Sequence, residues 1–376
     1  MRVAFLYSHD YTSEYERFNR GEVPAHWLFG AAHFAEFGHE AIFFAWPTWL
    51  PDRLRHKFVW RTWQAFMAVI SQRRLAAIVC TTETPAQTLL LLSRIGLVRR
   101  PVAVMTVALL SIANSTGIRR RLWSWLLAKA DVVYCYASSQ VADLRTAFGL
   151  EGSQLTFLPF GVDTDFFAVA PSRGGTPHVL CVGTNAGKDM PTLVRALPDG
   201  RTCTIVSDPL NIDLARETVG AASVDFRQNV PISELRELYQ DAVHIVIPLK
   251  TTTVSSGQTV LLENLVSGRV VIVSDVTSVA DYIRGTACLT IPAGNVARLH
   301  ELLMAPVSYQ AAADEVLYAR TEFNSRRLTV TVIADLESVI SRYGLSKACA
   351  VTLETGDADA GASGLPRWTG PGAQRS

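Results

Sequence analysis

The sequence predicts an α/β protein with two Rossmann-like domains, each a parallel β-sheet flanked by helices. Two observations lead to this expectation. Short runs of Val, Ile and Phe, bounded by turn residues, alternate with helix-length segments along the 376-residue chain, a pattern typical of parallel sheets. This series stops near residue 170 and then begins again, and the length of the chain suits two domains better than one.

The first domain is predicted to span residues 1–169 and to contain six strands. Its apolar runs lack the apolar–polar alternation of a half-exposed strand, as expected where helices cover both faces of a sheet. One of the intervening segments, 25–37, has the length of a helix and ends at Gly38. The predicted strands cover residues 3–7, 41–44, 76–80, 102–106, 132–136 and 155–158.

A linker with Pro, Ser and Gly, residues 170–178, precedes the second domain, which is predicted to span 179–325. A last apolar-periodic segment, 326–345, predicts a helix that returns to the first domain. The remaining residues, 346–376, are rich in Gly, Ala and Asp and are expected to be disordered. The strands predicted for the second domain cover residues 179–182, 202–206, 243–247, 270–273 and 288–291.

Composition narrows the function. The 35 basic and 34 acidic side chains nearly balance, so the chain has no overall basic character that would indicate a nucleic-acid binder. Its six cysteines form no CxxC pair and lie mostly in apolar runs, which predicts buried thiols in a reducing cytoplasm and no metal site. The N-terminal apolar run is too short for a signal peptide, and no run is long enough to span a membrane.

Two segments of the first domain mix Trp, Leu and Phe with Arg: residues 57–74 and 119–129. Such composition suits helices that lie in a membrane interface, with arginines on the lipid head groups. Amphipathic core helices whose arginines extend into solvent would look the same. The expected location is therefore cytoplasmic, with contact to the inner face of a membrane as an open alternative.

The most informative segment is 251–275, TTTVSSGQTVLLENLVSGRVVIVSD. A polar turn containing glycine leads into a helix, and the free N–H groups and positive dipole end of such a helix bind phosphate well. Glu263 lies about two turns into that helix, where its carboxylate could reach sugar hydroxyls beside a phosphate. An ordinary helix cap made by Ser255, Ser256 and Thr259 explains the pattern equally well.

A second strand–turn–helix pattern is CVGTNAGKDMPTLVRAL, residues 181–197. It is not a P-loop, because the distance from Gly183 to Gly187 is one residue short and Asp189 replaces the required Ser or Thr. Lys188 could still provide a positive charge to a diphosphate. The alternative is a solvated surface lysine.

Several segments, in this order, resemble the retaining glycosyltransferases of GT-B fold called family four, or glycosyl transferases group 1. The segment ADVVYCYASSQVADLRTAFGLEGSQLTFLPFGVDTDFF is similar to the end of the family's first domain. CVGTNAGKDMPTLVRAL, ISELRELYQDAVHIVIPLK and SGQTVLLENLVSGRVVIVSD resemble its donor domain, which DYIRG and IPAGNVARLHELL complete. The resemblance covers about residues 130–303, and the order of several motifs is more specific than any one of them.

The resemblance implies transfer of a sugar from a nucleoside diphosphate to an unidentified acceptor, with retention and without a metal or other cofactor. Glu263 would hydrogen-bond the ribose, and Lys188 would stabilise the departing diphosphate. Val230 would lie near the base, and Gly21 is the expected glycine of the first-domain loop. The other donor-binding residues that it implies are Gly183, Thr184, Asn185, Ser255, Ser256, Gly257, Gln258 and Thr259.

The chain departs from the family at three points. Ser255 stands where the first of two glutamates is common, Thr184 and Asn185 stand where an arginine is frequent, and VMTVALLSIAN lacks a histidine. A nucleotide-sugar epimerase of the same fold, or a catalytically silent sugar-nucleotide-binding partner protein, therefore stays open. A nicotinamide-dependent dehydrogenase is disfavoured, because no G-x-G-x-x-G follows an early strand. Four polar residues near the expected cleft are either ligand contacts or ordinary surface residues: His9, Asp10, Glu14 and His26.

Overall fold

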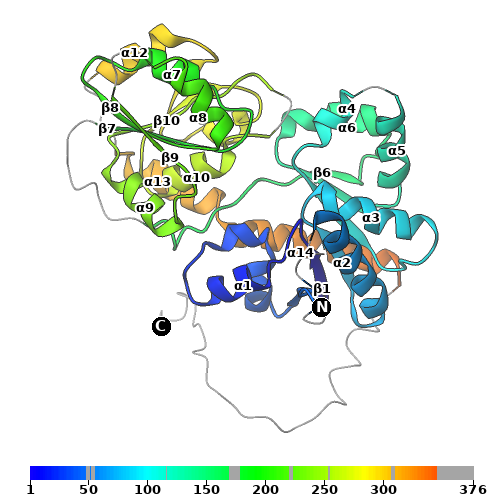
Figure 1. The fold of residues 1–376 in the computed structure, drawn as a ribbon. Coiled ribbons are helices and arrows are strands. Elements are labelled where there is room, and N and C mark those ends of the chain that lie inside the picture. The colour runs from blue at the N-terminus through cyan, green and yellow to red at the C-terminus, as the bar shows by residue number, and fades with distance from the viewer. Residues whose placement is uncertain are drawn as a thin grey trace, which may run out of the picture.

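The computed structural model describes residues 1–47, 51, 56–115, 117–168, 178–219, 223–252, 255–305 and 310–344. These residues form two domains, each built on a six-stranded sheet (Figure 1). The strand order is β2-β1-β3-β4-β5-β6 in the first sheet and β12-β11-β10-β7-β8-β9 in the second. Every pairing within both sheets is parallel. The predicted fold class, two Rossmann-like α/β domains, is confirmed.

The strands of the first sheet are the six that the sequence predicts, with ends shifted by one or two residues. They are β1 (Arg2–Leu6), β2 (Glu40–Ile42), β3 (Ala77–Cys80), β4 (Val102–Thr106), β5 (Val132–Cys135) and β6 (Leu155–Phe157). The central strands β3, β4 and β5 are buried along their whole length. Their uninterrupted apolar sequence follows from this two-sided burial.

The second sheet contains one strand that the sequence analysis missed. Its strands are β7 (His178–Val182), β8 (Thr202–Val206), β9 (Ser223–Arg227), β10 (His244–Ile247), β11 (Val271–Asp275) and β12 (Cys288–Pro292). The missed strand, β9, reads SVDFR and lies at the edge of the sheet, where none of its residues is fully buried. An edge strand with polar side chains lacks the apolar run by which the other strands were recognised.

Helices α2, α3, α5 and α6 pack side by side over one face of the first sheet (Figure 1). The helices of this domain are α1 (Thr12–Asn19), α2 (Lys57–Ser71), α3 (Glu83–Arg94), α4 (Leu109–Ala113), α5 (Ile118–Leu127) and α6 (Val141–Phe148). The expected helix 25–37 is wrong. Two short 3₁₀ segments, η1 (Ala25–Leu28) and η2 (Ala31–Phe37), take its place.

The break between η1 and η2 lies at Phe29 and Gly30, which both have positive φ angles. Helix α14 (Ser325–Arg342) approaches so closely here that a Cβ atom on Gly30 would lie 2.7 Å from Cδ2 of Leu328. The Thr329 hydroxyl also donates to the Gly30 carbonyl over 2.8 Å. The last helix, orange in Figure 1, therefore returns to the first domain as predicted.

The helices of the second domain flank its sheet in the same way. They are α7 (Met190–Ala196), α8 (Pro209–Arg216), α9 (Ile232–Asp241), α10 (Gln258–Val266), α11 (Ala280–Ile283), α12 (Val296–Met304) and α13 (Ala313–Glu322). One cluster of buried apolar residues runs from the first domain through the junction into the second. The two sheets are thus joined by a continuous core on the side where α14 lies.

The cysteines of the described residues are unpaired. Cys80, Cys135, Cys181 and Cys203 are buried, and Cys288 is half-buried. Burial raises the pKa of the Cys135 and Cys288 thiols to about 11. These thiols behave as small apolar side chains, as predicted, while the sixth cysteine lies outside the described residues.

Candidate functional site

Two loops of the second domain meet at the carboxyl ends of the neighbouring strands β7 and β10. The first loop, residues 183–188, follows β7, and the second, residues 248–257, follows β10 and ends at α10. They pair through a bridge between Lys188 and Leu249, and the Lys250 N–H donates to the Gly187 carbonyl over 2.9 Å. Ligands of open α/β sheets bind at this edge.

Lys188 is the most unusual residue of these loops. It is only 2% exposed, and its Nζ atom has no hydrogen-bond partner among the described residues. Burial lowers the pKa of Lys188 to about 8. A buried cation without a counter-charge is costly in a folded chain, and a bound anion at this position would offset that cost. The alternative of a solvated surface lysine is wrong.

Gly183 makes room for the Lys188 side chain. Its φ angle is +151°, and an added Cβ atom would lie 2.0 Å from Cε and 2.7 Å from Nζ of Lys188. Gly187 also leaves no room for a side chain, because an added Cβ atom would lie 2.9 Å from the side chain of Ser256. Gly183 therefore leaves room for the Lys188 side chain to pack against the first loop, and Gly187 lets the second loop approach the first.

The side chains of the two loops are hydrogen-bonded to one another. The Ser256 hydroxyl donates to Oδ1 of Asn185 over 2.7 Å, and the same oxygen accepts the Gly187 N–H. Ser255 is buried, and its hydroxyl donates to Oε1 of Gln140 in the first domain over 3.3 Å. The position where the family often has a glutamate thus lies at the domain junction.

Helix α10 begins at this meeting point. Gly257, with φ +91°, is its N-cap residue, and no side chain caps the helix. Ser256 is engaged with Asn185, and Nε2 of Gln258 donates to the Ser278 carbonyl over 2.8 Å. An ordinary serine or threonine cap is therefore not observed, and the first N–H groups of α10 have no side-chain partner among the described residues.

Glu263 lies deeper in α10 and is 3% exposed. Its Oε2 atom accepts a hydrogen bond from the Tyr239 hydroxyl over 2.8 Å. Its Oε1 atom lies 3.2 Å from Nε2 of His26, which belongs to η1 of the first domain. Both oxygens of the carboxylate are therefore engaged, one of them across the junction.

The position of the His26 proton follows from its second contact. Nδ1 lies 3.2 Å from the backbone nitrogen of Asp163, which can only donate, so Nδ1 is the acceptor. When the ring is neutral, Nε2 therefore carries the hydrogen and donates it to Glu263. The Asp163 carboxylate in turn accepts the N–H groups of Ala25, Asp165 and Phe166. Asp163, the last residue of the segment Gly161–Asp163, thus holds η1 in place. Because His26 belongs to η1, the same contacts position the histidine.

The other predicted residues are placed as follows. Thr184 is exposed, Thr259 and Val230 are half-buried, and Val230 follows β9. Gly21 lies in the exposed turn after α1, where an added Cβ atom would meet nothing within 4 Å. The role of Gly21 in donor binding stays a prediction.

The other three polar residues proposed for the cleft make contacts within the first domain. Asp10 accepts hydrogen bonds from the backbone and hydroxyl of Thr12 at the start of α1, and it also accepts the Trp46 N–H over 3.2 Å. Glu14 pairs with Arg17, and the His9 ring lies 4.5 Å from the Tyr11 ring at a tilt of 39°. Of the polar residues proposed for the cleft, His26 contacts another predicted site residue, Glu263.

The sequence analysis missed Tyr239, Gln140 and Asp163 as members of the site. Tyr239 lies near the end of α9 and Gln140 lies before α6, so each is far along the chain from the residue that it contacts. No local pattern marks them. The described residues contain no cluster of three His, Cys, Asp or Glu side chains able to hold a metal ion.

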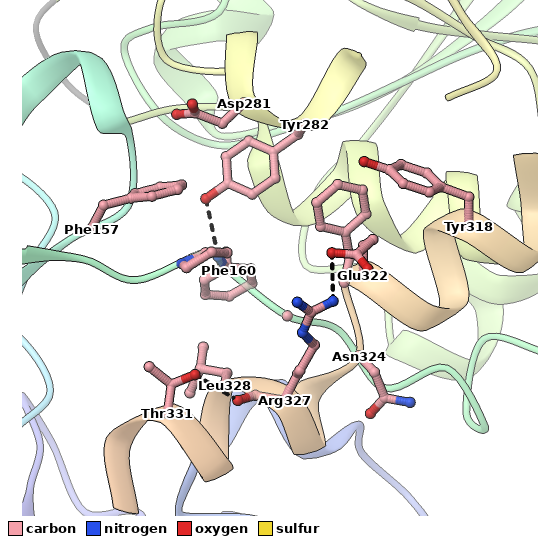
Figure 2. A pocket seen from close by; sticks show the side chains of 13 residues that line it. Phe157, Phe160, Asp281, Tyr282, Tyr318, Glu322, Asn324, Arg327, Leu328 and Thr331 are labelled. Atoms are coloured by element: carbon pink, nitrogen blue, oxygen red, sulfur yellow. Dashed lines mark hydrogen bonds and ion pairs between the residues drawn. The ribbon is translucent and has the colours of Figure 1, made fainter. Parts of the chain in front are cut away.

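A pocket of about 210 Å³ lies at the hinge between the domains, away from these loops. Figure 2 shows the Tyr282 hydroxyl directed at the backbone of Phe160, and an ion pair between Arg327 and Glu322. The Tyr282 hydroxyl accepts the Phe160 N–H over 3.0 Å and donates to the Tyr136 carbonyl over 2.6 Å. None of the predicted site residues lines this pocket.

Comparison with known proteins agrees with this architecture. Residues 176–305 match the profile of the family described as glycosyl transferases group 1. A search of curated protein sequences gives no significant match.

Solved structures with the same fold cover nearly the whole chain. Sucrose-phosphate synthase from Thermosynechococcus elongatus is 16% identical, with a TM-score of 0.68 over 91% of this chain and all of its own. HepE from Anabaena, solved with UDP-glucose, is 13% identical, with a TM-score of 0.67 over 90% of this chain and all of its own.

A third structure matches over a smaller share of both chains. The UDP-forming α,α-trehalose-phosphate synthase from Burkholderia xenovorans is 13% identical, with a TM-score of 0.59 over 75% of this chain and 79% of its own. The chain thus has the two-domain GT-B fold, and its second domain matches the glycosyl transferases group 1.

Proposed function

We propose that this protein transfers a sugar from a nucleoside diphosphate to an acceptor hydroxyl, with retention at the anomeric carbon. The observation that carries the proposal is the buried Lys188 side chain, whose Nζ atom finds no partner in the described structure. A diphosphate at the loops after β7 and β10 would supply the missing negative charge. The family match of the second domain supports the same reading.

The roles of the two central residues follow from their positions. Lys188 and the free N–H groups of α10 would stabilise the diphosphate as its bond to the anomeric carbon breaks. The acceptor oxygen then forms the new bond to the anomeric carbon, and its proton passes to an oxygen of the departing diphosphate. Removing one such charge typically costs about 3 kcal/mol of barrier, or roughly a hundredfold in rate. No metal is required in this scheme, because the protein supplies the positive charge.

Glu263 would bind the ribose of the donor. Each oxygen of its buried carboxylate already accepts one hydrogen bond, from Tyr239 and from His26, and a ribose hydroxyl would reach the carboxylate by displacing one of these two side chains. We expect His26 to be replaced, because it belongs to the other domain and separates from Glu263 if the domains open. Nucleotide binding and domain opening would then be coupled at this contact.

The donor base is best sought first among uridine nucleotides. HepE was solved with UDP and with UDP-glucose, and the trehalose-phosphate synthase is described as UDP-forming. We expect UDP to raise the melting temperature of the wild type and to have little effect on Glu263→Ala. ADP, GDP, CDP and their sugars are tested beside it.

A silent sugar-nucleotide-binding protein is the second candidate. It is favoured by Ser255, an uncharged residue that is tied to Gln140 at the position of a common family glutamate. Sugar transfer or donor hydrolysis by the wild type, lost in Lys188→Met, would support the enzyme. Nucleotide binding without turnover across a panel of acceptors would support the silent protein. If no nucleotide changes the melting temperature of the wild type, both candidate functions are contradicted.

A further inference from the structure

Part of the first domain is strongly basic although the whole chain is nearly neutral. Residues 57–130 hold eleven Lys and Arg residues and a single acidic one, Glu83, whereas the chain has 35 basic and 34 acidic side chains in total. The Glu83 carboxylate is turned inward, where its Oε1 atom accepts the N–H groups of Val107 and Ala108. Burial raises the pKa of this carboxyl. With eleven basic residues and one acidic residue, this stretch carries a formal net charge of +10.

The same stretch exposes large apolar side chains. Ile118 is 85% exposed, and it forms a single stripe on α5 with the residues four and seven positions later. Phe66 and Ile70, which lie one turn apart on α2, form a second exposed apolar pair. The exposed apolar residues of these helices and the turn after α3 are Phe58, Phe66, Ile70, Leu91, Ile95, Leu97, Ile118, Leu122 and Trp125.

These residues belong to one outer layer, formed by α2, α3 and α5 on the same face of the sheet (Figure 1). Arg61 of α2 donates to Gln87 of α3 over 3.2 Å. Arg94 of α3 lies over the Trp125 ring of α5 at 4.9 Å and donates to the Trp125 carbonyl. We name this surface the α2–α3–α5 face.

Three arginines of this face have no ion-pair partner among the described residues. Arg119, Arg120 and Arg121 are exposed in the first turn of α5 and form no ion pair with any described residue. Positive charge at a helix N-terminus opposes the helix dipole. The arrangement costs stability in the isolated protein, and an external anion would relieve that cost.

We propose that the α2–α3–α5 face docks on an anionic membrane surface. The apolar side chains would enter the interface, and the arginines would lie among the lipid phosphates. The partner must be apolar and anionic at once. A second copy of this face would bring the same positive charge, and a nucleic acid would leave Ile70, Ile118 and Leu122 in water. None of the helices in the described part of the chain combines the length and hydrophobicity of a membrane span.

A pocket of about 310 Å³ joins this face to the sheet edge. It is lined by Arg61, Gln87, Ser111 and Arg119, among others, at the carboxyl ends of β3 and β4. If the proposed sugar transfer holds, a docked membrane would present the head group of a lipid-borne acceptor to this pocket. This consequence rests on the proposed function, whereas docking itself does not.

The test is flotation of the full chain with vesicles of phosphatidylcholine, alone or mixed with phosphatidylglycerol, at physiological ionic strength. The wild type should float with the mixed vesicles and much less with the neutral ones. The triple variant Phe66→Ser/Ile70→Ser/Ile118→Ser should bind the mixed vesicles at least about tenfold more weakly. Its matched control is Leu210→Ser/Met304→Ser/Leu317→Ser, which removes three equally exposed apolar side chains from the second domain.

Folding of each variant is checked by its melting temperature and by its nucleotide shift. Flotation of the control but not of the face variant establishes docking. Two results would overturn the proposed docking. The wild type could stay at the bottom of the gradient with mixed vesicles, or the face variant could float as well as the wild type. A dimer in solution that only the face variant disrupts would assign the face to a second copy instead. The nucleotide shift is measured separately, so failure of docking leaves the donor site untouched.

Discussion

His26 and Glu263 face each other across the domain junction, with Nε2 and Oε1 3.2 Å apart and both side chains almost fully buried. The histidine is held by the backbone of Asp163, and the carboxylate is held by Tyr239. A residue implied to bind the donor therefore also connects the two domains.

His26→Ala should lower the melting temperature, because it leaves one oxygen of Glu263 buried and unpaired, at a cost of about 1–3 kcal/mol. It should at the same time tighten nucleotide binding a few-fold, because a ribose hydroxyl no longer competes with the imidazole. Thermal unfolding and calorimetric titration with UDP measure the two effects. His26→Gln, which can still donate to Glu263, serves as the control. Nucleotide binding that weakens as much as in Glu263→Ala would mean that His26 positions the carboxylate.

Lys188→Met should abolish most nucleotide binding without lowering stability. The substitution keeps the length of the side chain and removes a buried charge that has no partner. We expect roughly a hundredfold loss of UDP affinity and an unchanged or higher melting temperature. Lys129→Met, at an exposed site of the first domain, should change neither quantity. A strongly destabilised Lys188→Met would indicate a structural lysine.

The affinity for a nucleoside diphosphate should depend on pH through the same residue. Because the pKa of Lys188 is lowered to about 8, the free protein loses this charge above pH 8, and affinity should fall by up to tenfold per pH unit. Stability of the free protein should change in the opposite direction. The folded state binds fewer protons than the unfolded chain between about pH 8 and 10.5, so its free energy of unfolding rises with pH there. Lys188→Met should show neither trend in comparative titrations and melts.

Gly183→Ala should weaken nucleotide binding more than the strain of an alanine at positive φ alone explains. The new Cβ atom would lie 2.0 Å from Cε of Lys188 and would force the lysine out of its position. Gly200 is the matched control, because it also has positive φ but would meet nothing within 4 Å. Both variants should lose about 1 kcal/mol of stability, and only Gly183→Ala should lose nucleotide binding by tenfold or more. Equal nucleotide affinities would contradict the proposed site.

Tyr282→Phe should loosen the hinge between the domains. It removes the hydroxyl that accepts from Phe160 and donates to Tyr136 (Figure 2). We expect a loss of about 1–3 kcal/mol, because a buried N–H and a buried carbonyl remain unpaired. Tyr318→Phe is the control at the other side of the pocket, where the ring is 43% exposed. Denaturant unfolding of both variants checks the difference.

The sequence predicted those features that depend on neighbouring residues. Buried parallel strands require continuous apolar runs, so β3, β4 and β5 were recognisable, whereas the polar edge strand β9 was not. The helix expected at 25–37 was wrong, because α14 presses against Gly30 from almost 300 residues away in the chain. Local pattern cannot register such a neighbour.

The candidate site likewise has features that the sequence predicts and features that only tertiary structure decides. Two polar turns that lead into helices were visible in the sequence, because turn residues and a following apolar period are local signals. Their meeting, the burial of Lys188 and the contact between His26 and Glu263 were decided by tertiary structure alone. His26 and Glu263 are 237 residues apart, and only the packing of one domain on the other brings a polar pair together at that separation. The sequence thus determined two α/β domains and the polar turn that precedes α10, and the packing decided which side chains lie against that turn.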